Sequence, residues 1–376
     1  MLQSLVYSFP TAKRNRLQAS QAKRPPLPDQ ASTAPGPSVH RPRALLHVLR
    51  GRAFAFYSYF CGMKAGSYLL LALLWALSRL PMRVLYVLSD CLFPLVYHLV
   101  RYRRGLVRRQ LEESFPEKPS RWRGRVERKY YHFLCDYVVE TVKLMHMGSG
   151  EMERRVTFEG LRELQEEMGR RGKQFALACL GHYGNWEWVA SFSLRLEPGF
   201  GGAQIYHPLK NPLMDRLFIR IRRQFGGDCI AMRDTLRHVL AAGKGGKREV
   251  IGFIADQCPK WEAMHHWTEF LHHQTSFLTG VEQISKRVNS CVVYVHVTRP
   301  CRGRYHCRIV PLAWDPRDHK DYEITDLYAS ALEGQIREQP ELWLWTHRRW
   351  KRTREEWLAR SMARAKTGRN HTEDNK

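Results

Sequence analysis

The chain has 376 residues, and its 61 lysines and arginines against 36 aspartates and glutamates give a formal net charge of +25. This length allows one enzyme-sized domain with segments left over at the ends. Such an excess of positive charge indicates an anionic partner, which nucleic acid, anionic lipid headgroups or an acidic carrier protein would each satisfy. The nine scattered cysteines include no CxxC pair, so they argue against a disulfide framework or zinc ribbon and favour a reducing compartment.

Residues 1–62 have the composition of a disordered basic leader. They contain proline clusters and nine lysines and arginines against a single acid, Asp29, so they cannot bury enough apolar surface to fold. They also lack the continuous apolar core and cleavage site of a secretory signal. We expect either a disordered leader or an upstream start, with Met63 as the working initiator.

Residues 63–110 are predicted to form an apolar, membrane-associating helical segment. Two apolar stretches separated by SRLPMR occupy residues 67–100, which is long enough to enter a bilayer as a kinked helix or hairpin. The arginines of the following RYRRGLVRR suit the anionic cytoplasmic leaflet of a membrane. The alternative is a buried amphipathic helix pair in a soluble core.

The main domain is predicted over residues 111–353, with a charged tail at 354–376. Helical periodicity over residues 121–147 gives way to short apolar runs, which lie at 174–180, 203–207, 228–232, 249–256, 290–298 and 305–314. Helical segments, such as 211–225 and 235–243, lie between most of these runs. The alternation predicts an α/β fold with a mainly parallel sheet flanked by helices, and the last two strands are expected to form an antiparallel edge pair. Ligands of such sheets bind beyond the carboxyl ends of the strands.

The stretch ALACLGHYGNWEWVAS places two titratable side chains at the end of a predicted buried strand. Asn185 is expected to cap the helix that follows, so that His182 lies in the turn and Glu187 in the first helical turn. With the chain turning at Gly184, Glu187 could hold the imidazole of His182 in one tautomer, and the other nitrogen would take a proton from a substrate hydroxyl. The alternative is a hydrogen-bonded structural histidine followed by a carboxylate at a helix N-terminus.

Four further blocks follow HYGNWEW along the chain: YHPLKNPLMDRLFIRIRRQFG, GFIADQCPKW, FLTGVEQISK and QPELWLWTHRRWK. Their order and spacing resemble the lipid A biosynthesis acyltransferases, the late lauroyl and myristoyl transferases of Gram-negative bacteria, within the lysophospholipid acyltransferase superfamily. The resemblance extends from about residue 63 to about residue 353. The block ADQCPKW resembles the branch found in Bacteroidota more than the enterobacterial branch, which leaves the acceptor open.

The resemblance implies transfer of a fatty acyl chain onto a hydroxyl of an anionic glycolipid, the lipid A precursor. The donor would be acyl carrier protein or acyl-CoA, and no metal or other cofactor is implied. His182 would be the general base and Glu187 its partner. An arginine that stabilises an oxyanion or holds a phosphate would be Arg222 or Arg223.

Other residues of the matching blocks are predicted to bind substrate. Asp256 would orient that arginine or a headgroup, unless it is a buried helix-capping aspartate. Arg348 and Arg349, beside tryptophans, suit a phosphate-bearing membrane surface or the acidic helix of a carrier protein. Asn185, the expected cap of the helix after the turn at Gly184, is also predicted to bind substrate. The expected location is the inner membrane, with the catalytic domain facing the cytoplasm.

The sequence is also compatible with other functions. The main alternative is an acyltransferase for another membrane lipid, an aminolipid or a lysophospholipid, and a catalytically silent membrane scaffold of the same fold is a further one. The histidines of MHHWTEFLHHQTS lack the HExxH spacing of a zinc site and are interpreted as surface residues of a loop. A basic nucleic-acid-binding protein fits the charge, but the usual binding signatures are missing from the sequence, so nucleic acid is not expected as a partner.

Overall fold

The computed structural model describes residues 65–373, and the predicted leader at residues 1–62 lies outside the described residues. By their contacts, the residues divide into a small N-terminal unit that ends at Ala76 and a large unit that begins at Leu77. The described part of the small unit belongs to helix α3 (Ala65–Ser78). The large unit contains every other element described below.

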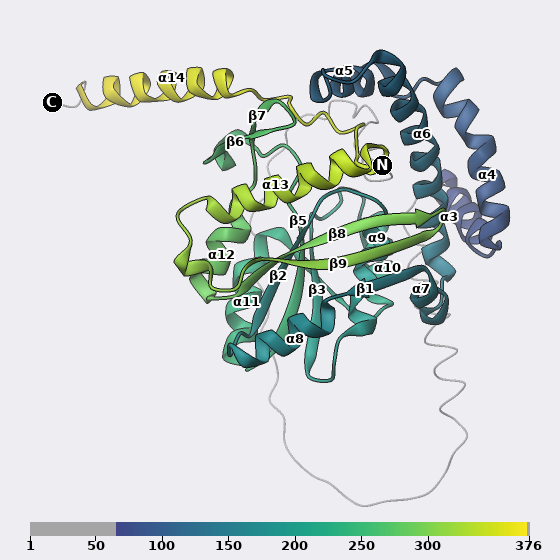
Figure 1. Ribbon diagram of the computed structural model, residues 1–376, viewed down its shortest axis with the longest axis horizontal. Coiled ribbons are helices and arrows are strands. Elements are labelled where there is room, and N and C mark those ends of the chain that lie inside the picture. Colours follow the sequence, from purple (N-terminus) through teal and green to yellow (C-terminus); the bar gives the residue numbers. More distant parts are fainter. Residues whose placement is uncertain (1–64, 374–376) are drawn as a thin grey trace, which may run out of the picture. The chain divides into compact units, whose positions relative to one another are not determined.

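A seven-stranded sheet forms the centre of the large unit (Figure 1). Its strand order is β1-β9-β8-β2-β5-β3-β4, and all neighbours are parallel except β8 and β9. The strands are β1 (Val156–Glu159), β2 (Phe175–Leu180), β3 (Phe200–Tyr206), β4 (Asp228–Ala231), β5 (Arg248–Ile254), β8 (Cys291–Cys301) and β9 (Arg304–Ala313). The predicted α/β fold with a mainly parallel sheet flanked by helices is confirmed.

Two features of the strands differ from the prediction. The short strand β1 pairs with the outer side of β9, so the antiparallel β8–β9 pair is not at the edge of the sheet. The histidine-rich segment predicted as a loop forms a separate hairpin of β6 (Trp267–Phe270) and β7 (His273–Ser276). Among the described residues, no group of three or more histidines, cysteines or acids could hold a metal ion.

Helices surround the sheet. They are α4 (Met82–Pro94), α5 (Arg104–Ser114), α6 (Ser120–Lys143), α7 (Ser149–Arg155), α8 (Leu161–Arg170), α9 (Trp186–Val189), α10 (Pro212–Arg223), α11 (Thr235–Lys244), α12 (Gly280–Val288), α13 (Glu323–Glu338) and α14 (Arg354–Glu373). Shorter helical turns are η1 (Leu95–Leu99), a π-helix, and the 3₁₀ turns η2 (Leu144–His146), η3 (Ala190–Arg195), η4 (Met232–Asp234), η5 (Trp261–Ala263), η6 (Pro316–Asp318) and η7 (Pro340–Leu342). The predicted boundaries at residues 110 and 353 stay predictions.

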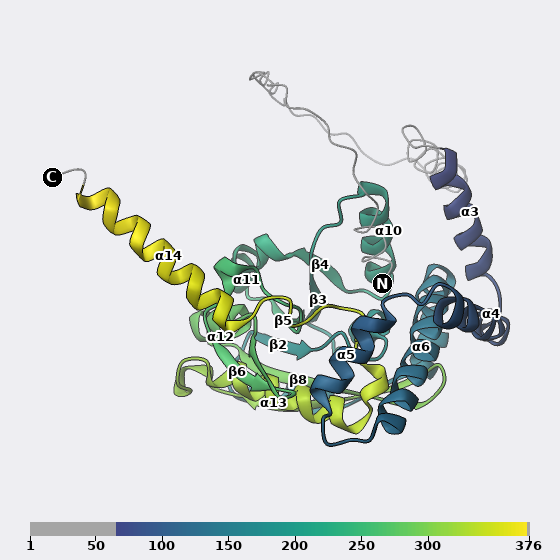
Figure 2. The same ribbon diagram turned by 90° about the horizontal axis from the view of Figure 1, so that it is seen from above.

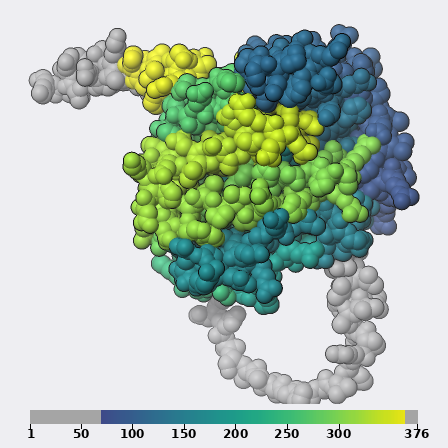
Figure 3. Space-filling model, viewed as in Figure 1, coloured from purple at the N-terminus to yellow at the C-terminus, as the bar shows by residue number. Residues whose placement is uncertain are grey.

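Different helices cover the two faces of the sheet. Successive side chains of a strand point to opposite faces, so neighbouring residues contact different helices. Tyr294 of β8 donates a hydrogen bond to Gln335 of α13, whereas the next residue, Val295, lines a cavity beneath α9 and α10. Figure 2 shows α10 and α13 on opposite sides of the strands. In the space-filling view, α13, the β8–β9 pair and α8 form the front of the molecule (Figure 3).

Helix α4 is apolar on both of its faces. Its inner face packs against α6 through Met82, Leu85 and Phe93, which are buried. Its outer face and the following turn leave further apolar side chains exposed: Val84, Val87, Leu88, Leu95, Leu99 and Val100. Met82–Leu99 is the one window among the described residues long and apolar enough to cross a membrane, and only 22% of it is buried. This low burial disagrees with the alternative of a core helix, and membrane association stays a prediction.

Candidate active site

The turn of residues 181–185, called the motif turn below, follows the carboxyl end of β2. Backbone hydrogen bonds to a segment far away in the sequence hold it in place. Gly184 has φ +57°, a left-handed conformation that favours glycine, and a Cβ there would approach Val297 Cγ1 to 3.1 Å. The N–H of Gly184 donates to the carbonyl of Leu342 at 3.0 Å, and the N–H of Leu344 donates to the carbonyl of His182 at 3.1 Å. The predicted turn at Gly184 is therefore confirmed, and it is fixed against the QPELWLW block.

Asn185 caps helix α9, as predicted. Its side-chain oxygen accepts a hydrogen bond from the N–H of Trp188 at 3.2 Å. Its amide nitrogen donates to the carboxylate of Glu140 on α6 at 2.8 Å. Both Asn185 and Glu140 are completely buried, with 0% exposure, so Asn185 supports the turn from within and does not face a substrate.

His182 is held by Asp256. Strand β2 pairs Leu180 with Ile254 of β5, so the residues two positions further along, His182 and Asp256, leave adjacent parallel strands at the same edge. The Nδ1 of His182 lies 2.6 Å from Asp256 Oδ1, and the backbone N–H of His182 donates to Oδ2 at 2.8 Å. The indole N–H of Trp343 also donates to Oδ2, at 2.9 Å.

The charge of Asp256 follows from these contacts. Burial alone would raise the pKa of Asp256, but the charge of His182 and the hydrogen bonds from His182 and Trp343 outweigh it and lower the pKa to about 2. The ionised carboxylate therefore accepts the Nδ1 proton of His182. When the imidazole is neutral and carries its proton on Nδ1, the other ring nitrogen, Nε2, is a hydrogen-bond acceptor, and the amide nitrogen of Gln257 lies 3.1 Å from it.

The predicted contact between His182 and Glu187 is wrong. Both oxygens of Glu187 bind Arg222 of α10, with Nε at 2.8 Å from Oε2 and Nη2 at 2.6 Å from Oε1. The side chains of Glu187 and Arg222 are 3% and 8% exposed, so this is a buried bidentate ion pair. Helix α9 begins immediately after the turn and directs Glu187 toward α10, which is why the acid on the neighbouring strand and not the acid in the motif reaches the imidazole.

The structure separates the two arginines between which the sequence could not choose. Burial alone would lower the pKa of Arg222, but the charge and hydrogen bonds of Glu187 outweigh it and raise the pKa. Arg223 points to the surface, where it pairs with Asp228 at 2.6 Å. Of the two, Arg222 is therefore the buried arginine and the one that lines the cavity described below. The predicted role of Asp256 in orienting this arginine is also wrong, since Asp256 binds His182.

The QPELWLWTHRRWK block, predicted to contact a membrane surface or a carrier protein, lies partly inside the molecule. Trp343 and Trp345 are 2% and 0% exposed. Arg349 is also buried, donates to the carbonyl of Ser276 at 2.7 Å and lies over the ring of Phe277, and burial lowers its pKa. Its side chain is thus closed off from a membrane surface, whereas Arg348 is exposed.

The same block contributes a second histidine that the sequence did not predict. The Nε2 of His347 accepts a hydrogen bond from the backbone N–H of Cys258 at 3.3 Å, two residues after Asp256. Burial and the nearby charge of His182 lower the pKa of His347 to about 3, so this histidine is neutral. A histidine in a run of tryptophans and arginines gives no sequence signal for this position.

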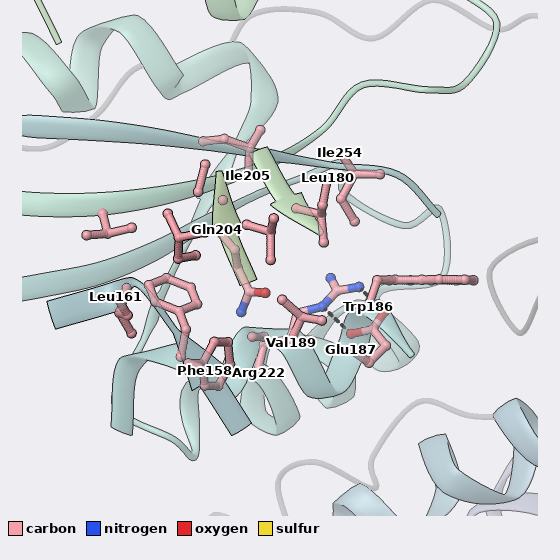
Figure 4. Close-up of a pocket in the computed structure, with 17 residues that line it drawn as sticks. Phe158, Leu161, Leu180, Trp186, Glu187, Val189, Gln204, Ile205, Arg222 and Ile254 are labelled. Carbon is pink, nitrogen blue, oxygen red and sulfur yellow. Dashed lines mark hydrogen bonds and ion pairs between the residues drawn. The ribbon is translucent and has the colours of Figure 1, made fainter. Parts of the chain in front are cut away.

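A narrow cavity lies between the sheet and the helical segments α9, η3 and α10. The space inside it that a water-sized probe can occupy is about 60 Å³. Figure 4 shows Trp186 and the Glu187–Arg222 pair at one end, and Phe158 and Leu161 toward the other. The ring of Trp186 also contacts that of His182 edge to face at 5.1 Å between centroids, so this end of the cavity is the one next to the imidazole. The remaining walls are almost entirely hydrocarbon, which suits an alkyl chain.

A histidine held by a buried carboxylate at the carboxyl end of a parallel sheet, beside an apolar cavity, is an arrangement that α/β enzymes use to accept a proton from a substrate. The model of the bacterial lipid A biosynthesis acyltransferase family matches residues 59–352. The chain therefore belongs to the bacterial lipid A biosynthesis acyltransferases, as its motifs predicted.

Individual relatives agree with this family. The lipid A biosynthesis lauroyltransferase of Escherichia coli is 25% identical over 283 residues, which cover 75% of this chain and 90% of the relative. The palmitoleoyltransferase of the same organism is 24% identical over 288 residues, covering 75% and 89%. A lipid A biosynthesis acyltransferase of Haemophilus influenzae is 21% identical over 293 residues, covering 77% and 88%. The closer resemblance to the Bacteroidota branch stays a prediction.

Proposed function

We propose that this protein transfers a fatty acyl chain from an acyl thioester to a hydroxyl of a lipid A precursor, with acyl carrier protein as the donor and acyl-CoA as the alternative donor. The observation that supports this most directly is the His182–Asp256 pair beside the apolar cavity. Together with the family, it supplies a base for the acceptor and a place for the acyl chain.

The proposed reaction needs one proton acceptor. The Nε2 of His182 takes the proton of the acceptor hydroxyl, which displaces the amide of Gln257 from that nitrogen. The hydroxyl oxygen attacks the thioester carbon, the carbon–sulfur bond breaks, and the imidazolium returns the proton to the departing thiolate. Asp256 keeps the proton on Nδ1 and stabilises the transient imidazolium, which makes it a positioning residue.

Arg222 is proposed to stabilise the oxygen of the thioester as it gains negative charge. Its Nε and Nη2 are used by Glu187, and both residues line the cavity at the end next to Trp186. A fixed cation in a buried site stabilises such a charge without reorganisation. Glu187 would then act through Arg222, as the residue that holds the guanidinium in place.

The protein is also proposed to work at the cytoplasmic face of the inner membrane. The exposed apolar side chains of α4, such as Val87 and Leu99, would enter the bilayer. The arginines between residues 101 and 109 follow this surface directly and suit anionic headgroups. The net positive charge also suits an acidic carrier protein and a phosphorylated glycolipid.

Substitution of His182 by alanine tests the function. The purified full chain would be assayed in detergent with acyl carrier protein thioesters and a lipid A precursor, and the loss of a general base should lower kcat by roughly 10²–10⁴-fold. His306→Ala, at the β1–β9 edge where His306 bonds Glu159, is the matched control and should keep its activity.

Unchanged transfer by the His182→Ala variant would refute the mechanism. Mass spectrometry of lipids from cells with and without the gene tests the acceptor. Loss of one acyl chain from lipid A supports the proposal, whereas unchanged lipid A with an altered aminolipid or phospholipid would refute this acceptor.

A further inference from the structure

The nitrogen of His182 that would take the substrate proton is already engaged by the protein. The amide nitrogen of Gln257 lies 3.1 Å from Nε2. In the neutral imidazole, Asp256 holds the proton on Nδ1, so Nε2 is the acceptor in this contact and the amide of Gln257 is the donor. The lone pair of the base is therefore masked before a substrate arrives.

The side chain of Gln257 is placed to move while its backbone stays fixed. The residue is half-buried, and no other described residue makes a hydrogen bond to its amide. Asp256, the residue before it, is bound by His182 through both the ring and the backbone N–H. The backbone N–H of Cys258, the residue after it, donates to His347 at 3.3 Å. Rotation of one side chain is thus enough to free Nε2.

An unmasked base would serve water as well as the acceptor. The side chain of His182 is 14% exposed, so water can reach the imidazole. Nε2 would take a proton from water, the water oxygen would attack the thioester carbon, and the carbon–sulfur bond would break. The imidazolium would return the proton to the departing thiolate, so the products would be a free fatty acid and a thiol. The acyl chain would then be lost before the acceptor binds.

Resting on the proposed function, we infer that Gln257 masks the base while the acyl donor is bound and so protects the thioester from hydrolysis. The acceptor displaces the amide because the rest of the acceptor also binds the protein. A single water molecule has no further contacts to offset the loss of that hydrogen bond. One hydrogen bond changes a population by roughly two- to tenfold, so hydrolysis is suppressed by about this factor. Gln257 acts through His182 and is a positioning residue.

The variant Gln257→Ala tests this role, with the purified full chain in detergent and an acyl thioester of acyl carrier protein. Without an acceptor, release of free fatty acid should rise by roughly two- to tenfold. With saturating lipid A precursor, kcat for transfer should change little, while KM for the precursor should fall by a similar factor because its binding no longer displaces the amide.

The control is Gln174→Ala. Gln174 is exposed at the opposite end of β2 from the motif turn, where its amide donates to the carbonyl of Gly243 at 3.3 Å. Both reactions should keep their rates in this variant. Unchanged hydrolysis in Gln257→Ala, or an equal loss of hydrolysis and transfer, would overturn the inference and leave the acyltransferase function of the unmodified protein intact.

A chemical probe separates this inference from the proposed function. If the unmodified protein transfers no acyl chain, the proposed function fails, but diethyl pyrocarbonate still tests the masking, because it reacts with an imidazole nitrogen whose lone pair is free. Peptide mass spectrometry would follow the modification of His182, with His306, which bonds Thr157 and Glu159, as the internal reference. Relative to His306, His182 should react roughly two- to tenfold faster in Gln257→Ala. Equal rates in the two proteins would overturn the masking of Nε2.

Discussion

At the scale of single residues, the partner of His182 is decided by strand register. Asp256 lies two residues beyond the strand partner of Leu180, and a depressed pKa of about 2 keeps it ionised at every pH at which the enzyme would work. Asp256→Asn keeps the shape of the side chain but removes the charge that fixes the Nδ1 proton. We expect kcat to fall by roughly 10²–10⁴-fold with little change in KM, measured by acyl transfer across a pH series.

The structure offers a matched control for this substitution. Asp326 binds His266 at 2.7 Å, in a histidine–aspartate pair of the same kind that lies away from the cavity. Asp326→Asn should leave both kcat and its pH profile unchanged. Loss of activity in Asp326→Asn comparable to that in Asp256→Asn would show that the effect is general destabilisation, and full activity of Asp256→Asn would exclude its positioning role.

The Glu187–Arg222 pair leads to a prediction about stability. Glu187→Gln leaves the guanidinium of Arg222 buried without a counter-charge, which typically costs about 3–5 kcal/mol in the free energy of unfolding. The exposed pair of Arg223 and Asp228 has a similar closest distance, 2.6 Å, but Asp228→Asn should cost no more than about 1 kcal/mol. Urea unfolding of the two variants measures the difference, and similar losses in both would contradict the assigned burial.

At the scale of elements, α6 holds the motif turn through one buried carboxylate. Glu140 accepts hydrogen bonds from Tyr86 of α4, from Asn185 of the turn and from Tyr305 of β9, each at 2.8 Å. Its backbone carbonyl also accepts the indole N–H of Trp188 in α9. Three elements and the turn thus meet at Glu140, so the orientation of Asn185 depends on residues far away in the chain.

Asn185→Asp tests this arrangement. An aspartate still caps α9, but its second oxygen replaces the amide that donates to Glu140, so two buried carboxylates meet. We expect a loss of several kcal/mol in the free energy of unfolding at pH 8. Asn211→Asp is the control, because Asn211 caps α10 at an exposed position and the change there should be within about 0.5 kcal/mol.

The pH dependence of the same variant has a defined sign. Burial already raises the pKa of Glu140, and a second carboxylate raises it further in the folded state only. A group whose folded pKa is raised binds more protons when folded, so the stability it contributes is lost as pH rises. Relative to the unmodified protein, Asn185→Asp should therefore be less destabilised at pH 5 than at pH 8. A pH-independent difference would contradict the contact between the two acids.

The sequence predicted most elements but not those formed by weak local signals. The buried strands are continuous apolar runs, such as FALACL in β2, and both their positions and their parallel arrangement were predicted. Strand β1 is only VTFE, half of it exposed, and its pairing depends on β9, about 150 residues later. The β6–β7 hairpin contains polar residues, and its turn places Leu271 and His272 at positive φ. Such turns usually contain glycine or asparagine, so leucine and histidine give no signal for one.

At the scale of the whole molecule, the same limit applies to the site. His182, the cap at Asn185 and the turn at Gly184 are local features of one motif, and they were predicted. The pairing of His182 with Asp256 depends on which strand lies next to β2, and the burial of Arg349 depends on how the C-terminal block folds back. Neither fact can be read from the spacing of residues in the sequence. The sequence therefore predicted Glu187, the nearest acid along the chain, as the partner of His182, and not Asp256, the nearest acid in space.

The outer face of α4 carries the last prediction, which concerns how the large unit binds lipid. Val87 and Leu99 are 60% and 75% exposed, and a charge at these positions would have to enter hydrocarbon if this face lies in a bilayer. The double substitution Val87→Glu and Leu99→Glu should therefore weaken sedimentation with vesicles of anionic phospholipid and reduce transfer to an acceptor embedded in them. Transfer to a detergent-dispersed acceptor should persist, because neither side chain reaches the cavity.

Leu240→Glu on α11, at an exposed leucine of another helix, is the control and should leave sedimentation unchanged. Undiminished sedimentation of the double variant would exclude α4 as the membrane-binding surface.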